Sequence, residues 1–278
     1  MQWWCSASGA AWSWSWQAYP GVWILIVLLA VGYARHSRQA RRRWGDVVTR
    51  RHLVAFGGGI VLLWLALDWP IGPLGASYLA SVHMVQFLMV GLAAPALLLL
   101  GFSRSAYQSL QGHPRVMALL NPLTHPAAAF LIFNVMMTIT HWPVVVDGLM
   151  PSQIGSFALD MAWLVSGLVF WWPLVSPVPD RPWFGDILQG AYLALNAIII
   201  APPFALLLFS KFPVYAIYEL APPIGHGTAL DDQQTAGALM KVGSAWILAV
   251  GIGFIVYRWY RRTGPGRGVD LQSRERSA

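Results

Sequence analysis

The distribution of arginine along the chain constrains the fold more than any other feature of the sequence. All sixteen arginines lie in the segments that follow the first, third, fifth and seventh long apolar runs, whereas both lysines, Lys211 and Lys241, lie near the opposite ends of such runs. Basic residues accumulate in the cytoplasmic segments of membrane proteins. The alternation therefore predicts a polytopic membrane protein with its N-terminus outside and its C-terminus in the cytoplasm.

The composition supports a membrane protein. Of the 278 residues, 57% are hydrophobic and only 10% are charged, against about 25% charged in soluble domains. The net charge is +7, but the basic residues flank apolar runs, so we interpret them as topology signals and expect no nucleic-acid partner. The chain has sixteen tryptophans, and tryptophan is enriched at membrane interfaces. The one cysteine, Cys5, excludes an intrachain disulfide and is expected to be a free thiol.

Seven apolar runs approach the ~20 residues that a helix needs to cross a bilayer. We therefore predict an all-α bundle of seven transmembrane helices. The predicted spans are 19–34, 52–67, 78–100, 126–141, 154–173, 187–209 and 235–257. Residues 1–18 would form a Trp-rich periplasmic or interfacial N-terminus, 19–262 the bundle, and 263–278 a disordered basic cytoplasmic tail.

The predicted outer segments are acidic where the inner ones are basic. They carry Asp68, Asp147, Glu219, Asp231 and Asp232. Such a field favours a cation that arrives from outside. The alternatives are that acidic residues are simply tolerated at this face, and that Asp231 or Asp232 caps the last helix.

His83 lies one to two turns inside the outer end of the third predicted span. On a helix it shares a face with Gln86, and Phe87 lies beside them. Polar residues at this depth usually face the bundle interior. His83 is therefore a candidate imidazole ligand for a metal, with Gln86 in support, or else a histidine that is hydrogen-bonded to a neighbouring helix.

His141 ends the fourth predicted span, because the following Trp-Pro pair disfavours helical geometry. Met137 lies one turn earlier on the same face. Imidazole and thioether both suit copper, although methionine in a membrane helix also serves simply to fill space.

The last predicted span carries Gln233, Gly237 and Met240 along one side. Gly237 would let a neighbouring helix approach closely. Asp232, Gln233 and Met240 are then candidate oxygen and sulfur donors that face the bundle.

Two charged residues fall inside apolar runs. Asp160 is costly in a membrane unless it is paired or protonated, so we expect it to contact His83 or His141, or to hold a proton or a metal. Lys241 is expected to pair with Asp160 or to extend toward the interface.

Four segments together resemble the CtaG family of cytochrome c oxidase assembly factors, in order and in spacing. They are YLASVHMVQ at 78–86, THWPVVVDGLM at 140–150, SGLVFWWPLV at 166–175 and DDQQTAGALM at 231–240. The resemblance implies a seven-span protein of the bacterial inner membrane that helps deliver copper to a haem–copper oxidase and is not an enzyme. It points to His83, Gln86, His141, Asp232, Gln233, Gln234, Gly237 and Met240.

The sequence departs from the family pattern at three positions where the family often has histidine. Phe87, Ser156 and Asp160 stand there instead, and Lys241 replaces a common tryptophan after Met240. The implied site therefore has fewer imidazoles and more acid and amide groups.

The sequence leads to one main hypothesis and two alternatives. The main hypothesis is an oxidase assembly factor that holds copper transiently at the outer leaflet and passes it to an oxidase subunit. Its metal ligands would be His83, His141, Asp232, Met240 and Asp160, supported by Gln86, Gln233, Gln234, Met137 and Gly237. The alternatives are a metal-free scaffold for an oxidase subunit and a transporter of a cation or small solute. No nucleophile–base pair or two-metal constellation indicates an enzyme.

Overall fold

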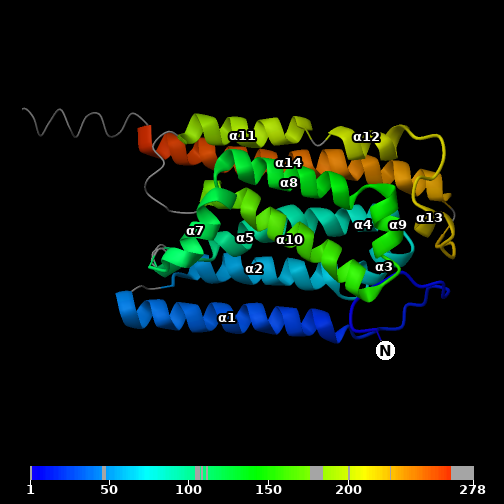
Figure 1. The fold of residues 1–278 in the computed structure, drawn as a ribbon, viewed down its shortest axis with the longest axis horizontal. Helices are drawn as coiled ribbons and strands as arrows, with labels where there is room; N and C mark the ends of the chain where they lie inside the picture. The colour runs from blue at the N-terminus through cyan, green and yellow to red at the C-terminus, as the bar shows by residue number, and fades with distance from the viewer. Residues whose placement is uncertain are drawn as a thin grey trace, which may run out of the picture.

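The structure is a computed structural model that describes residues 2–45, 48–103, 107, 109–110, 112–175, 184–199, 201–225 and 227–263. Every regular element in these ranges is a helix. The long helices lie side by side with their axes roughly aligned, and shorter helices lie at both ends (Figure 1). The predicted all-α class is confirmed.

Four long helices contain the first, second, fifth and seventh predicted spans. They are α1 (Pro20–Trp44), α2 (Arg50–Leu67), α10 (Gln153–Val175) and α14 (Ala229–Thr263). The helices α1 and α14 extend well beyond their predicted ends, because both continue through arginine-rich segments that are too polar to be counted as membrane span.

The third predicted span is one helix with a π-helical section in its middle. It consists of α4 (Ala80–Phe87), η1 (Leu88–Ala93) and α5 (Ala94–Leu100). Gly91 lies within the wide turn, and Pro95, which cannot donate a backbone hydrogen bond, follows it. Such π-bulges change the direction in which the following residues point.

The sixth predicted span is divided into α11 (Asp186–Ile199) and α12 (Ala201–Phe209). Pro202 and Pro203 lie in the first turn of α12. Proline is tolerated in a first turn but interrupts the hydrogen bonds of a helix interior, which explains why a second helix begins here.

The fourth predicted span is only 15 residues long as α8 (Pro126–Thr140). It follows α7 (Pro114–Leu123) after a bend of 68°. His125 is extended, as expected for a residue before proline. Among the described residues, six helices are long and apolar enough to cross a membrane, or seven if the bent pair counts as one span. The number seven therefore stays a prediction.

Three short helices and the N-terminal segment lie at one end of the bundle, which we call the acidic end after Asp68, Asp147, Glu219, Asp231 and Asp232. The short helices are α3 (Ile71–Ser77), α9 (Pro143–Leu149) and α13 (Ala216–Glu219) (Figure 1). Residues 2–19 contain no helix, yet Trp4 and Cys5 are buried. This segment is thus part of the folded bundle.

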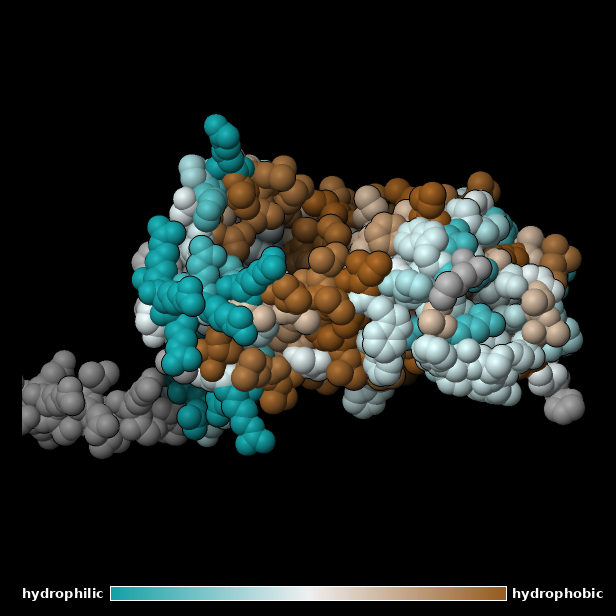
Figure 2. All heavy atoms as spheres, turned by 90° about the horizontal axis from the view of Figure 1, so that it is seen from below, coloured by the Kyte–Doolittle hydropathy of each residue, from teal (hydrophilic) through white to brown (hydrophobic). Residues whose placement is uncertain are grey.

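The opposite end, which we call the basic end, carries the arginines at the end of α1, the start of α2 and the end of α14. They are Arg41, Arg42, Arg43, Arg50, Arg51, Arg258, Arg261 and Arg262. Figure 2 shows hydrophilic residues at this end and an apolar belt between the two ends. Arg104, Arg181 and the predicted tail, apart from Thr263, lie outside the described residues.

The helix α10 runs through the middle of the bundle and packs on α8, η1 and α5. A Cβ atom at Gly167 would lie 2.1 Å from the carbonyl oxygen of Gly91, so only glycine fits where α10 crosses η1. This close crossing holds Trp163, one turn earlier on α10, beside the start of α4.

Candidate functional site

His83 and His141 lie together near the acidic end of the bundle, although 58 positions separate them in the sequence. His83 is in the first turn of α4, and His141 is the residue that caps the C-terminus of α8. Both are buried, at 2% and 1% exposure. Their ring centroids are 6.3 Å apart. The structure thus places the two imidazoles, which come from different helices, side by side.

Aromatic side chains enclose the two imidazoles. The indole of Trp163 stacks on His141 at 5.4 Å and lies 4.9 Å from the centroid of His83. Phe87 meets His141 edge-on at 4.7 Å, and Tyr218 lies 6.1 Å from His83. The histidine pair is therefore shielded from water.

Hydrogen bonds fix this enclosure. The Trp163 indole N–H donates to Oγ1 of Thr140 over 2.9 Å, and the Thr140 hydroxyl donates to the carbonyl of Met136 over 2.7 Å. The Tyr215 hydroxyl donates to the carbonyl of His141 over 2.8 Å. The end of α8 and the middle of α10 are thus tied together at His141.

Hydrogen bonding sets the tautomer of His141. Its Nδ1 lies 2.7 Å from the carbonyl oxygen of Met137. A carbonyl only accepts, so Nδ1 carries the proton, and in the neutral ring Nε2 has a free lone pair. The buried Nε2 has no hydrogen-bond partner in the part of the chain that the structure describes. A metal-binding histidine is usually oriented in this way through its other nitrogen.

His83 is less constrained than His141. Both of its ring nitrogens are buried, and neither makes a hydrogen bond to a described residue. Buried polar atoms without partners are rare in native proteins and call for an explanation. A shared ligand between His83 and His141 would supply one.

Asp160 and Gln86 lie in a neighbouring polar cluster. The Asp160 carboxylate accepts from the indole N–H of Trp4 over 2.8 Å and from the Gln86 amide over 3.2 Å. No hydrogen bond joins Asp160 to either histidine. The expected contact of Asp160 with His83 or His141 is therefore wrong, and the carboxylate instead fixes the N-terminal segment against α4 and α10. That Asp160 holds a proton or a metal stays a prediction.

The acidic residues at the start of α14 have separate roles. Thr228 caps α14, because its hydroxyl accepts from the backbone N–H of Asp231 over 3.2 Å, and the Asp231 carboxylate accepts in return from the backbone N–H of Thr228 over 3.1 Å. The expected cap by Asp231 or Asp232 is therefore wrong, since both lie inside the first turn. Asp232 accepts from the backbone N–H and the hydroxyl of Ser81 on α4. Asp232 therefore joins α14 to the helix that carries His83.

The side-chain amides of Gln233 and Gln234, on α14, make hydrogen bonds to α12 and to the segment between α12 and α13. Oε1 of Gln233 accepts from the Val214 N–H over 2.6 Å, and its amide donates to the Leu207 carbonyl over 3.3 Å. Gln234 donates to the Ser210 carbonyl over 3.4 Å. These contacts hold the segment from Leu207 to Val214 against the start of α14.

Gly237 and Met240 are in the packed interior. A Cβ atom at Gly237 would lie 2.8 Å from the backbone nitrogen of Leu208, which confirms the predicted close approach, here of α12. Met240 and Met137 are fully buried among core residues. The predicted pairing of Lys241 with Asp160 is wrong, because the Lys241 amine donates to the Ala197 carbonyl over 2.7 Å and lies 5.0 Å from the centre of the Phe204 ring.

Across the described residues, no group of three or more His, Cys, Asp or Glu side chains is placed to hold a metal ion. The structure thus brings two of the predicted ligands, His83 and His141, together, whereas Asp160 and Asp232 accept hydrogen bonds from other residues. With metal–nitrogen bonds of ~2.0 Å, two imidazoles that hold one ion in a linear arrangement have ring centroids roughly 6 Å apart. The centroids of His83 and His141 are 6.3 Å apart.

The family model described as cytochrome c oxidase caa3 assembly factor matches residues 31–262. The chain belongs to this family. No curated protein and no solved structure matches the chain. The matched range includes both histidines and every helix that surrounds them, while Trp4 lies before it.

Sequence reasoning missed the residues that shape the site. They are Trp4, Thr140, Trp163, Tyr215 and Tyr218. Trp163 and Thr140 could have been found from helical spacing, since each lies one turn or less from a residue already singled out. Trp4 gives no such signal, because its partner Asp160 is 156 positions away.

Proposed function

We propose that this oxidase assembly factor binds one copper(I) ion with the imidazoles of His83 and His141 and transfers the ion to an oxidase subunit. The observation that carries the proposal is a pair of buried imidazoles, 6.3 Å apart, each with a nitrogen that has no partner. Imidazole suits copper, and the Met137 carbonyl orients one of the two rings.

The donor set favours copper(I) as the cargo over zinc(II). A structural zinc site closes a tetrahedron with four ligands, whereas two neutral imidazoles in an aromatic enclosure offer low coordination and no negative charge. Such a site suits a soft monovalent ion. Low coordination also suits transfer, because an incoming ligand from the oxidase subunit can attack an ion with open positions.

The same proposal includes an orientation. The protein lies in the bacterial inner membrane with seven spans, the acidic end and the N-terminus outside, and the basic end in the cytoplasm. The support is the clustering of arginines at one end of the bundle, with an apolar belt between the two ends (Figure 2). The histidine pair would then lie near the outer leaflet, on the side where the acidic residues attract cations.

One observation favours a second candidate, a metal-free scaffold for an oxidase subunit. The described residues include no three-ligand group, and aromatic rings pack closely around both histidines. In that case His83 and His141 serve packing alone, and assembly of the oxidase does not depend on their nitrogens.

Competition for copper(I) separates the two candidates. Purified protein would be titrated under reducing conditions against a chromophoric copper(I) chelator, with His83→Gln and His141→Gln as variants. His113→Gln is the matched control, because His113 lies in the exposed turn before α7. Copper(I) competition that is lost in both site variants and kept in the control supports the carrier. Oxidase assembly in cells that is unchanged by both variants supports the scaffold.

A further inference from the structure

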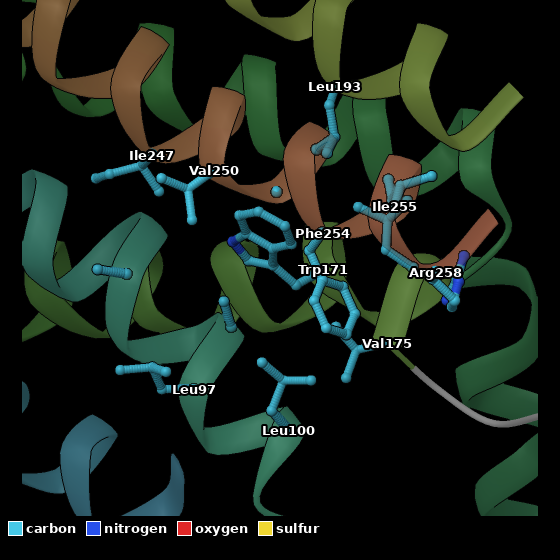
Figure 3. A pocket seen from close by; sticks show the side chains of 14 residues that line it. Leu97, Leu100, Trp171, Val175, Leu193, Ile247, Val250, Phe254, Ile255 and Arg258 are labelled. Carbon is cyan, nitrogen blue, oxygen red and sulfur yellow. The ribbon is translucent and has the colours of Figure 1, made fainter. Parts of the chain in front are cut away.

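A groove opens between α5, α10, α11 and α14 near the basic end of the bundle. Its volume is about 560 Å³, within the range of ligand pockets. Leu97, Leu100, Val250 and Phe254 line it, and Figure 3 shows them around the ring of Trp171. This groove lies on the basic side of the histidine pair, because its Trp171 is eight residues beyond Trp163 on α10 and Trp163 stacks on His141.

The groove opens sideways, through the apolar belt. Leu100, Val250 and Phe254 at its edge are exposed on the surface of the bundle. Ala93, Ala96 and Gly251 leave the space that larger side chains would fill. A Cβ atom at Gly251 would lie 3.1 Å from the Trp171 ring, so Gly251 allows this ring its position along the groove. An occupant would therefore enter from the hydrocarbon of the bilayer.

Two hydrogen-bond donors in the groove have no partner among the described residues. Trp171 is 5% exposed, and its indole N–H is buried without an acceptor. Nε of Arg258 is also buried and unpaired, although the guanidinium pairs with Asp186 over 2.7 Å. The other described residues that line the groove have apolar side chains or none. The groove thus offers donors and no side-chain acceptor, so its occupant must bring oxygen acceptors.

The charge around the groove is positive. Arg258 and Arg262 share the single carboxylate of Asp186, at 2.7 and 3.6 Å. Arg261 adds a further positive charge to the last turn of α14. Basic pockets between transmembrane helices bind anionic lipid head groups. An apolar channel, unpaired donors and excess positive charge together match one class of molecule.

We propose that this groove binds one anionic diacyl phospholipid. One acyl chain lies along Leu97, Val250 and Phe254. An ester oxygen accepts from the Trp171 indole, and the phosphate lies at Arg258. The proposal does not depend on copper, and a lipid that stays bound here would hold α5 and α14 together at the basic end.

Native mass spectrometry of delipidated full-length protein tests the proposal. The probes are phosphatidylglycerol and phosphatidylcholine with identical chains. Ala96→Trp would fill the groove, and Leu28→Trp, on the exposed face of α1, is its control. Trp171→Phe keeps an aromatic ring, smaller than the indole, and removes the donor. Arg258→Gln removes the charge, with Arg35→Gln, at an exposed position in the second half of α1, as its control.

We expect the wild type to retain one phosphatidylglycerol more tightly than phosphatidylcholine. Ala96→Trp should abolish that site while Leu28→Trp keeps it. Trp171→Phe should weaken both lipids about fivefold, the effect of one hydrogen bond. Arg258→Gln should remove the preference for the anionic lipid. Retention unchanged in folded Ala96→Trp and in Trp171→Phe would overturn the proposal, as would displacement of phosphatidylglycerol by equimolar phosphatidylcholine or an isoprenoid quinone. If Ala96→Trp does not fold, Trp171→Phe alone decides.

Discussion

The indole of Trp4 donates a hydrogen bond to the carboxylate of Asp160 over 2.8 Å, deep in the acidic end of the bundle. This bond joins the N-terminal segment to α10, beside the histidine pair. Gln86 donates to the other carboxylate oxygen, so both oxygens of Asp160 have a partner among described residues. The segment before the first span therefore completes the polar network behind the site.

Replacing Trp4 tests that network. Trp4→Phe keeps a smaller aromatic ring but removes the donor, which leaves a buried carboxylate with one partner fewer. We expect the loss to cost about 1–3 kcal/mol. Thermal unfolding in detergent should show a lower midpoint. Trp14→Phe, at a position that is 69% exposed, is the control, and equal midpoints for both variants would contradict the expectation.

The Cys5 thiol should react slowly in the native protein. Cys5 is buried, and its Sγ donates to the Leu67 carbonyl over 3.2 Å. Burial, with the nearby charges of Asp160 and Asp68, raises the pKa of the Cys5 thiol well above its ordinary value. The reactive thiolate therefore stays scarce as the pH rises through the range where an exposed thiol ionises.

Maleimide labelling between pH 7 and 9 checks this expectation. A Cys5→Ser protein with Ser15→Cys supplies an exposed thiol in the same segment, and its labelling should accelerate with pH. Labelling of Cys5 in the native protein should stay slow over this pH range. It should become fast in denaturant or in the Trp4→Phe variant. Labelling of native Cys5 at the rate of the exposed thiol would show that the segment is not packed.

The crossing of α10 with η1 should tolerate no side chain at Gly167. A Cβ atom there would lie 2.1 Å from the Gly91 oxygen and 2.8 Å from Cγ of Pro95. We expect Gly167→Ala to destabilise the protein by about 1–3 kcal/mol or more through overpacking. Gly253→Ala on α14 meets nothing within 4 Å and should be neutral or slightly stabilising. The measurement is the thermal unfolding midpoint of Gly167→Ala and of Gly253→Ala. Equal midpoints would argue against the close crossing of α10 and η1.

Thr140 should position the histidine pair without touching copper. Its hydroxyl accepts from Trp163, whose ring stacks on His141. Thr140→Val leaves the indole N–H without an acceptor, so the ring should shift and copper(I) affinity should fall by about tenfold, equivalent to ~1.4 kcal/mol. Thr140→Ser should restore the affinity. If Thr140→Val lowers stability but leaves copper(I) affinity unchanged, Thr140 is only structural.

The helices could be predicted from the sequence, because hydropathy and arginine placement act over single segments. Those patterns predicted the membrane class and most of the long helices, but they did not reveal α3, α9 and α13. Each of these short helices lies in a proline-containing connection at the acidic end. Their positions depend on tertiary contacts, such as Asp147 accepting from the backbone N–H groups of Ala216 and Ile217.

The candidate site could be predicted only in part. Helical spacing and the family resemblance identified His83 and His141, which the structure brings together. They could not show that Asp232 bonds to Ser81 or that Lys241 bonds to the Ala197 carbonyl. Which partner a buried polar group finds depends on how helices that are distant in sequence are rotated against each other, and one sequence does not encode that rotation in a readable pattern.

X-ray absorption spectroscopy of the copper(I)-loaded protein tests the central claim most directly. A site made by His83 and His141 predicts two nitrogen neighbours at ~2 Å, with imidazole outer-shell scattering and no sulfur. His141→Gln should lose this signal, and His113→Gln should keep it. A three- or four-coordinate spectrum with sulfur ligands, or the same spectrum in His141→Gln, would contradict the account.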